Sequence, residues 1–216
     1  LWQMAACDEA AVRWAAADAF EIAAARERPP STQLMRRAMG AFNWALAFRD
    51  WAATERYYRS ALENAEAIPE PALRDRLTIG LRSRRILQLA QRGDTDEAVQ
   101  LAMPLKAEFD AEYQRIGRIT SFESRFWTAL SHAQRLGGRA ADAEQTAQTF
   151  LDRCLVTMKT GPGGVCDQRA LAVLALARLD LGRIAEAQAA VEQRLARSQR
   201  FADDPNFALA YGRVLL

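Results

Sequence analysis

Apolar residues along this chain recur at helical spacing, and the same stripe of them returns about every 44 residues. In each copy of this pattern a turn comes first, a polar or acidic residue follows it, and a small residue then begins an amphipathic helix. The small residues are Ala10, Thr54, Ala98, Ala143 and Ala187. Their separations of 44, 44, 45 and 44 residues indicate an internal repeat of helical elements.

Two further columns repeat with these small residues. Four residues after each come Trp14, Tyr58, Ala102, Ala147 and Val191. Three residues further on come Ala17, Ala61, Leu105, Phe150 and Arg194. Offsets of four and seven lie on one face of a helix. We therefore expect these columns to form the buried side of one helix in each copy, with Arg194 breaking the stripe in the last.

A second helical segment precedes each of these helices. Its copies are expected at 31–48 with Ser31 as N-cap, at 71–92 with Pro71 in the first turn, at 120–136 from a capping box of Thr120 and Glu123, and at 167–181 capped by Asp167. Gly93, Gly138 and Gly182 follow three of them, and Arg49 holds that place in the first. A helix C-terminus favours a residue that tolerates positive φ there. Each copy is therefore predicted to be an antiparallel helix pair joined by a tight turn.

A helix pair of this kind cannot bury its apolar face alone, so neighbouring pairs must stack. We expect one domain over residues 1–216, with complete pairs at 31–68, 71–117, 120–157 and 167–200 and partial pairs at 1–28 and 204–216. Stacked arrays need polar capping repeats at their ends. Neither end supplies one, because the last helix opens at Asp204-Pro205 without a partner. We expect the chain to be a fragment of a larger protein.

The repeats carry motifs that resemble those of the tetratricopeptide repeat (TPR) family. They are Trp127-x-x-Leu130-Ser131 with Gly138 and Ala143, and Leu171-x-x-Leu174-Ala175 with Gly182 and Ala187. The repeat is about ten residues longer than the usual 34, and the closing proline is shifted or missing. In this it is similar to the repeats of kinesin light chains and of bacterial helical signalling regulators. The resemblance covers essentially the whole chain and implies an all-α fold, a right-handed α-solenoid of stacked antiparallel helix pairs.

One helix carries an irregularity. Pro104 falls inside the helix that begins near Asp94. Proline removes a backbone hydrogen bond and clashes with the preceding turn. We expect a kink at Pro104, or a break within about a turn of it, with Leu101 and Leu105 still facing the core.

The composition excludes several classes of protein. The 29 basic and 27 acidic residues leave a net charge of +2, without the basic stripe of a nucleic-acid module. The longest uninterrupted apolar run, Ala170 to Ala177, is too short to span a membrane. Nearly all cationic residues are arginine, which is typical of a GC-rich bacterial genome. We expect a bacterial protein with no membrane span in this segment and no nucleic-acid partner.

Little in the sequence indicates catalysis. His132 is the only histidine, and no cysteine stands near it at metal-ligand spacing. The glycine-rich segment 161–164 lacks the strand and Lys-Ser/Thr of a phosphate loop, so we interpret it as a connection between repeats. The aromatic residues Trp44, Trp51, Tyr57, Tyr58, Phe122, Phe126 and Trp127 have a spacing that suits a helical core better than a base-stacking platform. We predict no catalytic residues, no metal site and no cofactor.

Cys154 and Cys166 bracket the glycine-rich segment. A disulfide between them would pin two helices together and would require an oxidising compartment such as the periplasm. Two unlinked thiols would instead suit a cytoplasmic protein. The sequence leaves both alternatives open. Cys7 lies on a repeated column and is interpreted as a packed thiol.

The candidate binding surface follows from the resemblance, because the first helices of TPR arrays line the concave face. Arg125, Thr128, His132 and Arg135 are spaced 3, 4 and 3 residues apart, which places them on one helical face. Arg36, Asn43 and Arg169 hold similar positions in the adjoining repeats. Arginine binds carboxylates in a bidentate manner, so an acidic peptide would suit this surface. The alternative is a solvated face paired with nearby acids, and only Asn43 resembles the carboxylate clamp of co-chaperones.

These features favour a module of a larger bacterial protein that binds a protein or peptide partner along its groove. The alternative is a ligand-sensing domain of a bacterial signalling protein, such as a membrane receptor kinase or a transcriptional regulator. In that case a ligand would shift the curvature of the solenoid.

Overall fold

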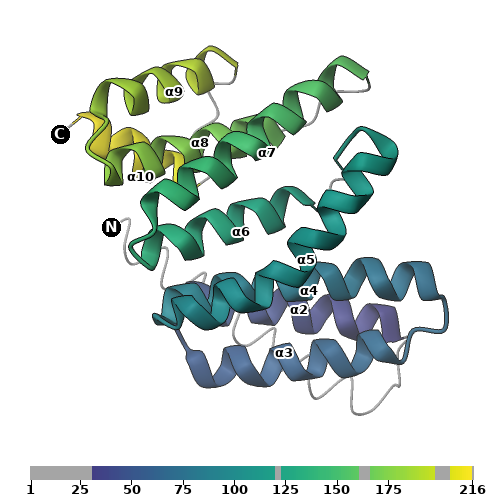
Figure 1. The fold of residues 1–216 in the computed structure, drawn as a ribbon. Coiled ribbons are helices and arrows are strands. Elements are labelled where there is room, and N and C mark those ends of the chain that lie inside the picture. Colours follow the sequence, from purple (N-terminus) through teal and green to yellow (C-terminus); the bar gives the residue numbers. More distant parts are fainter. Residues whose placement is uncertain (1–30, 120–122, 161–165, 198–204, 216) are drawn as a thin grey trace. The chain divides into compact units, whose positions relative to one another are not determined.

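The computed structural model of the protein describes residues 31–119, 123–160, 166–197 and 205–215. These residues form α-helices joined by short turns, without a strand among them (Figure 1). The helices are α2 (Ser31–Ala47), α3 (Trp51–Glu66), α4 (Pro71–Arg92), α5 (Thr95–Ile116), α6 (Glu123–Leu136), α7 (Ala140–Thr160), α8 (Cys166–Asp180), α9 (Ile184–Arg197) and α10 (Pro205–Leu215). The predicted all-α class is confirmed.

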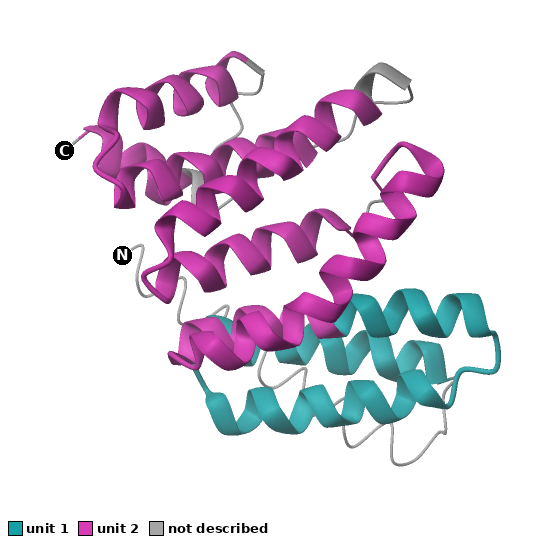
Figure 2. Cartoon of the chain, in the orientation of Figure 1, with its two compact units in different colours: residues 1–81 teal, residues 82–216 magenta. Residues whose placement is uncertain are grey.

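The chain divides into two compact units, Leu1–Leu81 and Arg82–Leu216 (Figure 2). Helix α4 begins in the first unit and ends in the second. In the first unit α2 packs against α3, and Leu81 of α4 belongs to the same core. That core consists of Met35, Ala38, Ala61, Ala65 and Leu81, with Met39, Tyr58 and Leu77 packed against it.

In the second unit each helix from α5 to α9 contacts the next along the chain. Helix α8 also contacts both α6 and α10. Among the largest buried side chains of this unit are Phe126 and Trp127 of α6 and Phe150 of α7. The rings of Phe109 and Phe126 are 4.9 Å apart, and those of Phe126 and Trp127 are 5.3 Å apart. The aromatic residues Tyr57, Phe126 and Trp127 are therefore core residues, as predicted.

The predicted tight turns share one hydrogen-bonding pattern. At the first turn the amide of Arg49 donates to the carbonyl of Leu46 over 3.1 Å, and the amide of Asp50 donates to that of Ala45 over 2.9 Å. This is the Schellman motif, which closes a helix on a residue of positive φ. The same two hydrogen bonds recur at Gly93, Gly138 and Gly182. The φ angles at the four turns are +57°, +102°, +74° and +73°.

The helices after these turns bury the predicted columns. The buried members are Thr54, Ala61, Ala98, Ala102, Leu105, Ala143, Ala147, Phe150, Ala187 and Val191. Tyr58 is half-buried. The expectation that Arg194 breaks the stripe is wrong, because its side chain is buried with the rest of the column. A long arginine stem can lie along apolar neighbours in this way.

Two local predictions can be compared with the structure. Helix α8 begins at Cys166, so Asp167 lies inside its first turn and is not the N-cap. Helix α5 continues through Pro104 without a break, and its ribbon bends along its length (Figure 1). Leu105 faces the core, while Leu101 is half-buried. Predictions for Cys7, Ala10, Trp14, Ala17, Thr120, Phe122, residues 161–164 and Asp204 lie outside the described residues.

Candidate binding surface

The four residues predicted along one face of the helix at 123–136 do lie along α6. Arg125 is exposed, while Thr128, His132 and Arg135 are half-buried. The opposite side of α6 carries buried residues such as Trp127. The hydroxyl of Thr128 donates to the carbonyl of Ser124 over 2.8 Å. The outer face of α6 is therefore a row of polar groups backed by a packed core.

The first half of this row lies among other cations. Although Arg125 is exposed as a whole residue, its charged group is partly removed from water, which lowers its pKa, and the positive charge of Arg169 on α8 lowers it further. Arg84 of α4 has a pKa lowered to about 10 by burial and then by the charge of Arg125. Guanidinium Nη1 of Arg169 donates to Oγ of Ser124 over 3.3 Å. Arg84, Arg125 and Arg169 are named here the arginine ladder.

Arg125, the exposed residue of the arginine ladder, has no negative charge paired with it among the described residues. Within the described part of the chain, Arg125 forms no ion pair. Two buried carboxylates, Glu123 and Asp167, stand two residues before Arg125 and Arg169 in the first turns of α6 and α8. Residues two apart on a helix face different sides. The carboxylates thus belong to the core side and the arginines to the outer side.

The second half of the row is different, because its cation is already paired. Nη1 of Arg135 lies 3.0 Å from Oδ2 of Asp180, and the Arg135 side chain is only 10% exposed. Nη1 of Arg213 on α10 reaches the other oxygen of Asp180 at 2.8 Å. Burial, and then the charge of Arg135, lowers the pKa of His132 to about 4 against the opposing effect of Asp180. His132 is thus neutral at pH 7, and the alternative of a face paired with nearby acids holds for Arg135.

The structure brings together only part of the predicted set. Arg125, Thr128 and Arg169 meet around Ser124, with His132 and Arg135 further along α6. Arg36 and Asn43 are exposed on α2, in the first unit. Cys154 on α7 and Cys166 on α8 are free thiols.

Sequence reasoning missed Arg84 and Ser124. Arg125 and Arg169 each stand 13 residues before the glycine of the following turn, whereas Arg84 stands nine residues before Gly93. Arg84 is therefore about one helical turn out of register with the other two. The separation of 44 residues between Arg125 and Arg169 indicates from the sequence alone that they hold equivalent positions in successive repeats. The position of Arg84 gives no such indication.

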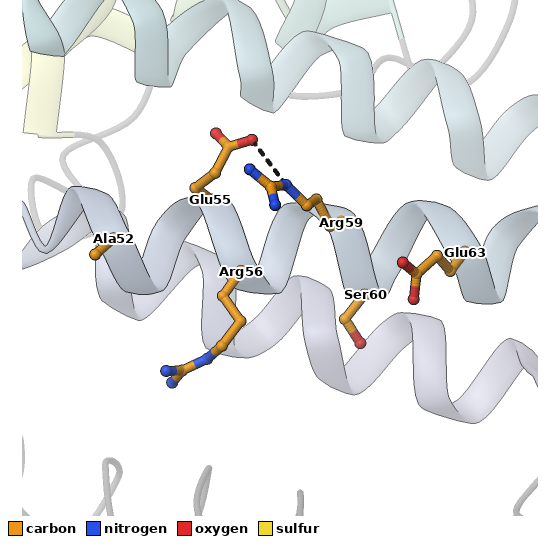
Figure 3. Close-up of a pocket in the computed structure, with 6 residues that line it drawn as sticks. All are labelled: Ala52, Glu55, Arg56, Arg59, Ser60 and Glu63. Carbon is orange, nitrogen blue, oxygen red and sulfur yellow. Dashed lines mark hydrogen bonds and ion pairs between the residues drawn. The ribbon is translucent and has the colours of Figure 1, made fainter.

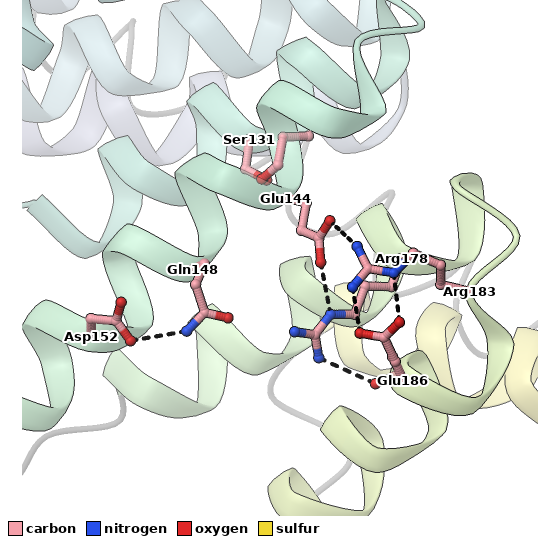
Figure 4. A network of polar contacts seen from close by, with 8 residues as sticks. Ser131, Glu144, Gln148, Asp152, Arg178, Arg183 and Glu186 are labelled. Carbon is pink, nitrogen blue, oxygen red and sulfur yellow. Dashed lines mark hydrogen bonds and ion pairs between the residues drawn. The ribbon is translucent and has the colours of Figure 1, made fainter.

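Most other arginines of the second unit are engaged in ion pairs, as Figure 4 shows for α7, α8 and α9. Nε of Arg178 lies 3.0 Å from Glu144, and Arg183 binds both Glu144 and Glu186. In the same view the buried hydroxyl of Ser131 donates to the carbonyl of Ala143 over 3.0 Å. These contacts hold the helices together and leave their arginines unsuited to an external anion.

A shallow hollow of about 450 Å³ on α3 is a weaker candidate (Figure 3). Its lining residues are Ala52, Glu55, Arg56, Arg59, Ser60 and Glu63. They belong to a single helix and carry two positive and two negative charges. Nε of Arg59 lies 3.4 Å from Glu55, and Arg56 donates to the hydroxyl of Tyr57. This arrangement is typical of a solvated helix surface.

Other kinds of site receive no support from the residues that the structure describes. They contain no group of three or more histidine, cysteine, aspartate or glutamate side chains that could hold a metal ion. None of their helices has the length and apolarity needed to cross a membrane. Comparisons with protein-family models, with curated proteins and with solved structures give no match.

Proposed function

We propose that the protein is an interaction module, and that the arginine ladder binds an acidic peptide segment of a partner protein. The observation that carries this proposal is the exposed guanidinium of Arg125, which lies beside another arginine and has no carboxylate of its own among the described residues. Guanidinium groups bind carboxylates through two parallel hydrogen bonds. The first turns of α6 and α8 add the positive ends of two helix dipoles.

We propose further that the helix pairs form a right-handed solenoid of the TPR kind. Four Schellman turns at the repeat interval support this arrangement. The contacts of α8 with both α6 and α10 also support it, because they join the first helices of successive pairs. In TPR arrays these helices line the concave face, which is where Arg125 and Arg169 would then lie. Small-angle scattering of the whole chain should give an elongated particle, and a spherical one would contradict the solenoid.

The spacing of the ladder suggests the form of the ligand. Packed helices lie about 8–10 Å apart, and a peptide in the extended polyproline II conformation advances about 3.1 Å per residue with three residues per turn. Carboxylates at every third residue of such a peptide would lie on one face, about 9 Å apart, and would therefore match arginines on neighbouring first helices. A peptide with the same composition but with its carboxylates clustered at one end should bind less well.

The test is fluorescence anisotropy with labelled peptides of these two designs. The double variant Arg125→Gln, Arg169→Gln should weaken binding of the spaced peptide about tenfold or more, since hydrogen bonds to charged groups contribute about 1.5–3 kcal/mol each. The matched control is Arg56→Gln, Arg59→Gln, which removes the same charge from α3 and should change binding less than about twofold. Binding should also weaken as salt rises.

Two outcomes would contradict the proposal. One is that the wild-type protein fails to bind the spaced peptide even at low salt. The other is that the α3 control loses as much affinity as the ladder variant, which would mean that net charge and not the ladder governs binding. Arg125→Lys provides a finer check, because lysine keeps the positive charge but cannot form the two parallel hydrogen bonds of a guanidinium group. It should fall between the wild type and Arg125→Gln.

A further inference from the structure

The two described cysteines meet across a helix pair. Cys154 lies on α7 and Cys166 is the first residue of α8, and these two helices pack against each other. Their thiols are near enough for each to shift the pKa of the other. Cys154 continues the buried column of α7, four residues after Phe150 and completely covered. The corresponding residues of α3 and α5 are Ala65 and Phe109, so this helix carries a thiol where α3 and α5 carry an apolar side chain.

The environments of the two thiols differ in a way that assigns them different roles. The neighbouring thiol of Cys154 lowers the pKa of Cys166, and the backbone amides of Cys166 and Asp167 at the start of α8 also favour its thiolate. Burial raises the pKa of Cys154, as do its contact with Cys166 and the carboxylates of Asp167 and Glu123. Thiolates and not thiols are the nucleophiles. Cys166, which is half-buried, is therefore the thiol that an oxidant reaches first.

We propose that Cys154 and Cys166 form a reversible disulfide that ties α7 to α8, with Cys166 as the attacking thiol and Cys154 as the resolving thiol. The oxidant is a small disulfide such as oxidised glutathione. The Cys166 thiolate attacks one sulfur of the oxidant, the bond between its two sulfurs breaks, and one glutathione thiolate leaves. Cys154 then attacks Sγ of Cys166 and passes its proton to the second glutathione, which leaves as a thiol. Two protein thiols are oxidised, and the oxidant is reduced to two glutathione thiols, which take up the protons.

The consequence of this bond follows from its position. It closes the loop between α7 and α8, which restricts the unfolded chain and favours the native state. The oxidised protein should unfold at a higher urea concentration than the reduced protein. The inference is independent of the proposed peptide binding, because its measurements involve only thiols and unfolding.

The test uses the full chain with Cys7→Ser, so that only the two thiols of interest remain. The folded protein is equilibrated in glutathione buffers of increasing oxidising power, and its products are identified by mass spectrometry. Both thiols should disappear together into an internal disulfide, and dithiothreitol should restore them. Folded protein that keeps both thiols, under conditions in which the urea-unfolded protein forms the disulfide, would overturn the proposal.

Two further variants test the assigned roles. With Cys154→Ser, Cys166 should accumulate as a mixed disulfide with glutathione, because the resolving thiol is missing. With Cys166→Ser, the buried Cys154 should remain reduced. The opposite pattern would overturn the assignment of roles. The thiol count of the parent with Cys7→Ser decides the main proposal even if one of these variants folds poorly.

Discussion

Replacement of Arg49 by glycine should stabilise the protein. Arg49 is the non-glycine residue of positive φ in the described part of the chain, at +57°. It occupies the turn position that Gly93, Gly138 and Gly182 hold in the other repeats, with the same hydrogen bonds around it. An L-residue in this region costs about 1–2 kcal/mol, because its Cβ approaches the following carbonyl oxygen. Glycine does not carry that cost.

The expected gain is smaller than the strain, because glycine also has more freedom in the unfolded chain. That freedom costs about 0.4–1 kcal/mol on folding. The difference predicts that Arg49→Gly raises the free energy of unfolding by about 0.5–1 kcal/mol. Arg49 is exposed, so its side chain contributes little that the variant would lose. The reverse change, Gly138→Ala, should cost a similar amount, since no atom lies within 4 Å of an added Cβ at that position.

The assay is urea unfolding followed by far-ultraviolet circular dichroism, with the midpoint and slope fitted for each variant. Arg49→Ala is the matched control, because it removes the side chain and keeps the strained backbone, and it should leave stability nearly unchanged. A gain in Arg49→Ala equal to that in Arg49→Gly would show that the side chain and not the backbone is responsible. A loss of stability in Arg49→Gly would refute the reasoning outright.

Three further changes test other contacts. Arg153→Met should cost about 2 kcal/mol in urea unfolding, because this arginine binds Asp110 at 2.6 Å and stacks on two aromatic rings; an unchanged midpoint would show that these contacts contribute nothing. Gly137→Ala should destabilise the protein, since its added Cβ would lie 3.0 Å from Oγ1 of Thr95 and 3.3 Å from the carbonyl oxygen of Ala133, and an unchanged midpoint would contradict the close approach. His132, with a pKa lowered to about 4 by burial, binds fewer protons when folded than its unfolded value of about 6.5 implies. Stability should therefore fall by up to about 3 kcal/mol as pH drops from 6.5 to 4, and His132→Gln should flatten that fall; a slope unchanged in the variant would assign it to other groups.

The helices and turns could be predicted because their signals are local. The glycines at the turns, the proline at the start of α4 and the small residues after each turn act within a few neighbouring positions. Even Arg49 was placed correctly, because the repeat interval outweighed the unfavourable residue type. The start of α8 was missed by one residue, which is the usual uncertainty at a helix end.

The polar face was harder to predict because partners on other helices decide the role of each residue. Arg125 and Arg135 look equivalent in the sequence of α6, ten residues apart on one face. Asp180 on α8 binds Arg135 and removes it from the candidate surface, whereas Arg169 meets Arg125 with a like charge. Spacing within one helix indicated which residues share a face. That spacing gave no information about which arginines of α6 form ion pairs with carboxylates on other helices.

The repeat interval explains why, among the described residues, some arginines of the second unit form ion pairs and Arg125 does not. Several arginines of the second unit face a carboxylate about one repeat away, and these contacts join neighbouring helix pairs. Such pairs are Arg135 with Asp180, Arg139 with Asp96 and Arg153 with Asp110, at separations of 45, 43 and 43 residues. Arg125 follows the same interval, but the residue 44 positions later is Arg169. Two like charges cannot form the ion pair that joins repeats at the other positions, because they repel. A bound anion would relieve that repulsion, which is why we propose Arg125 and Arg169 as the pair that a ligand binds.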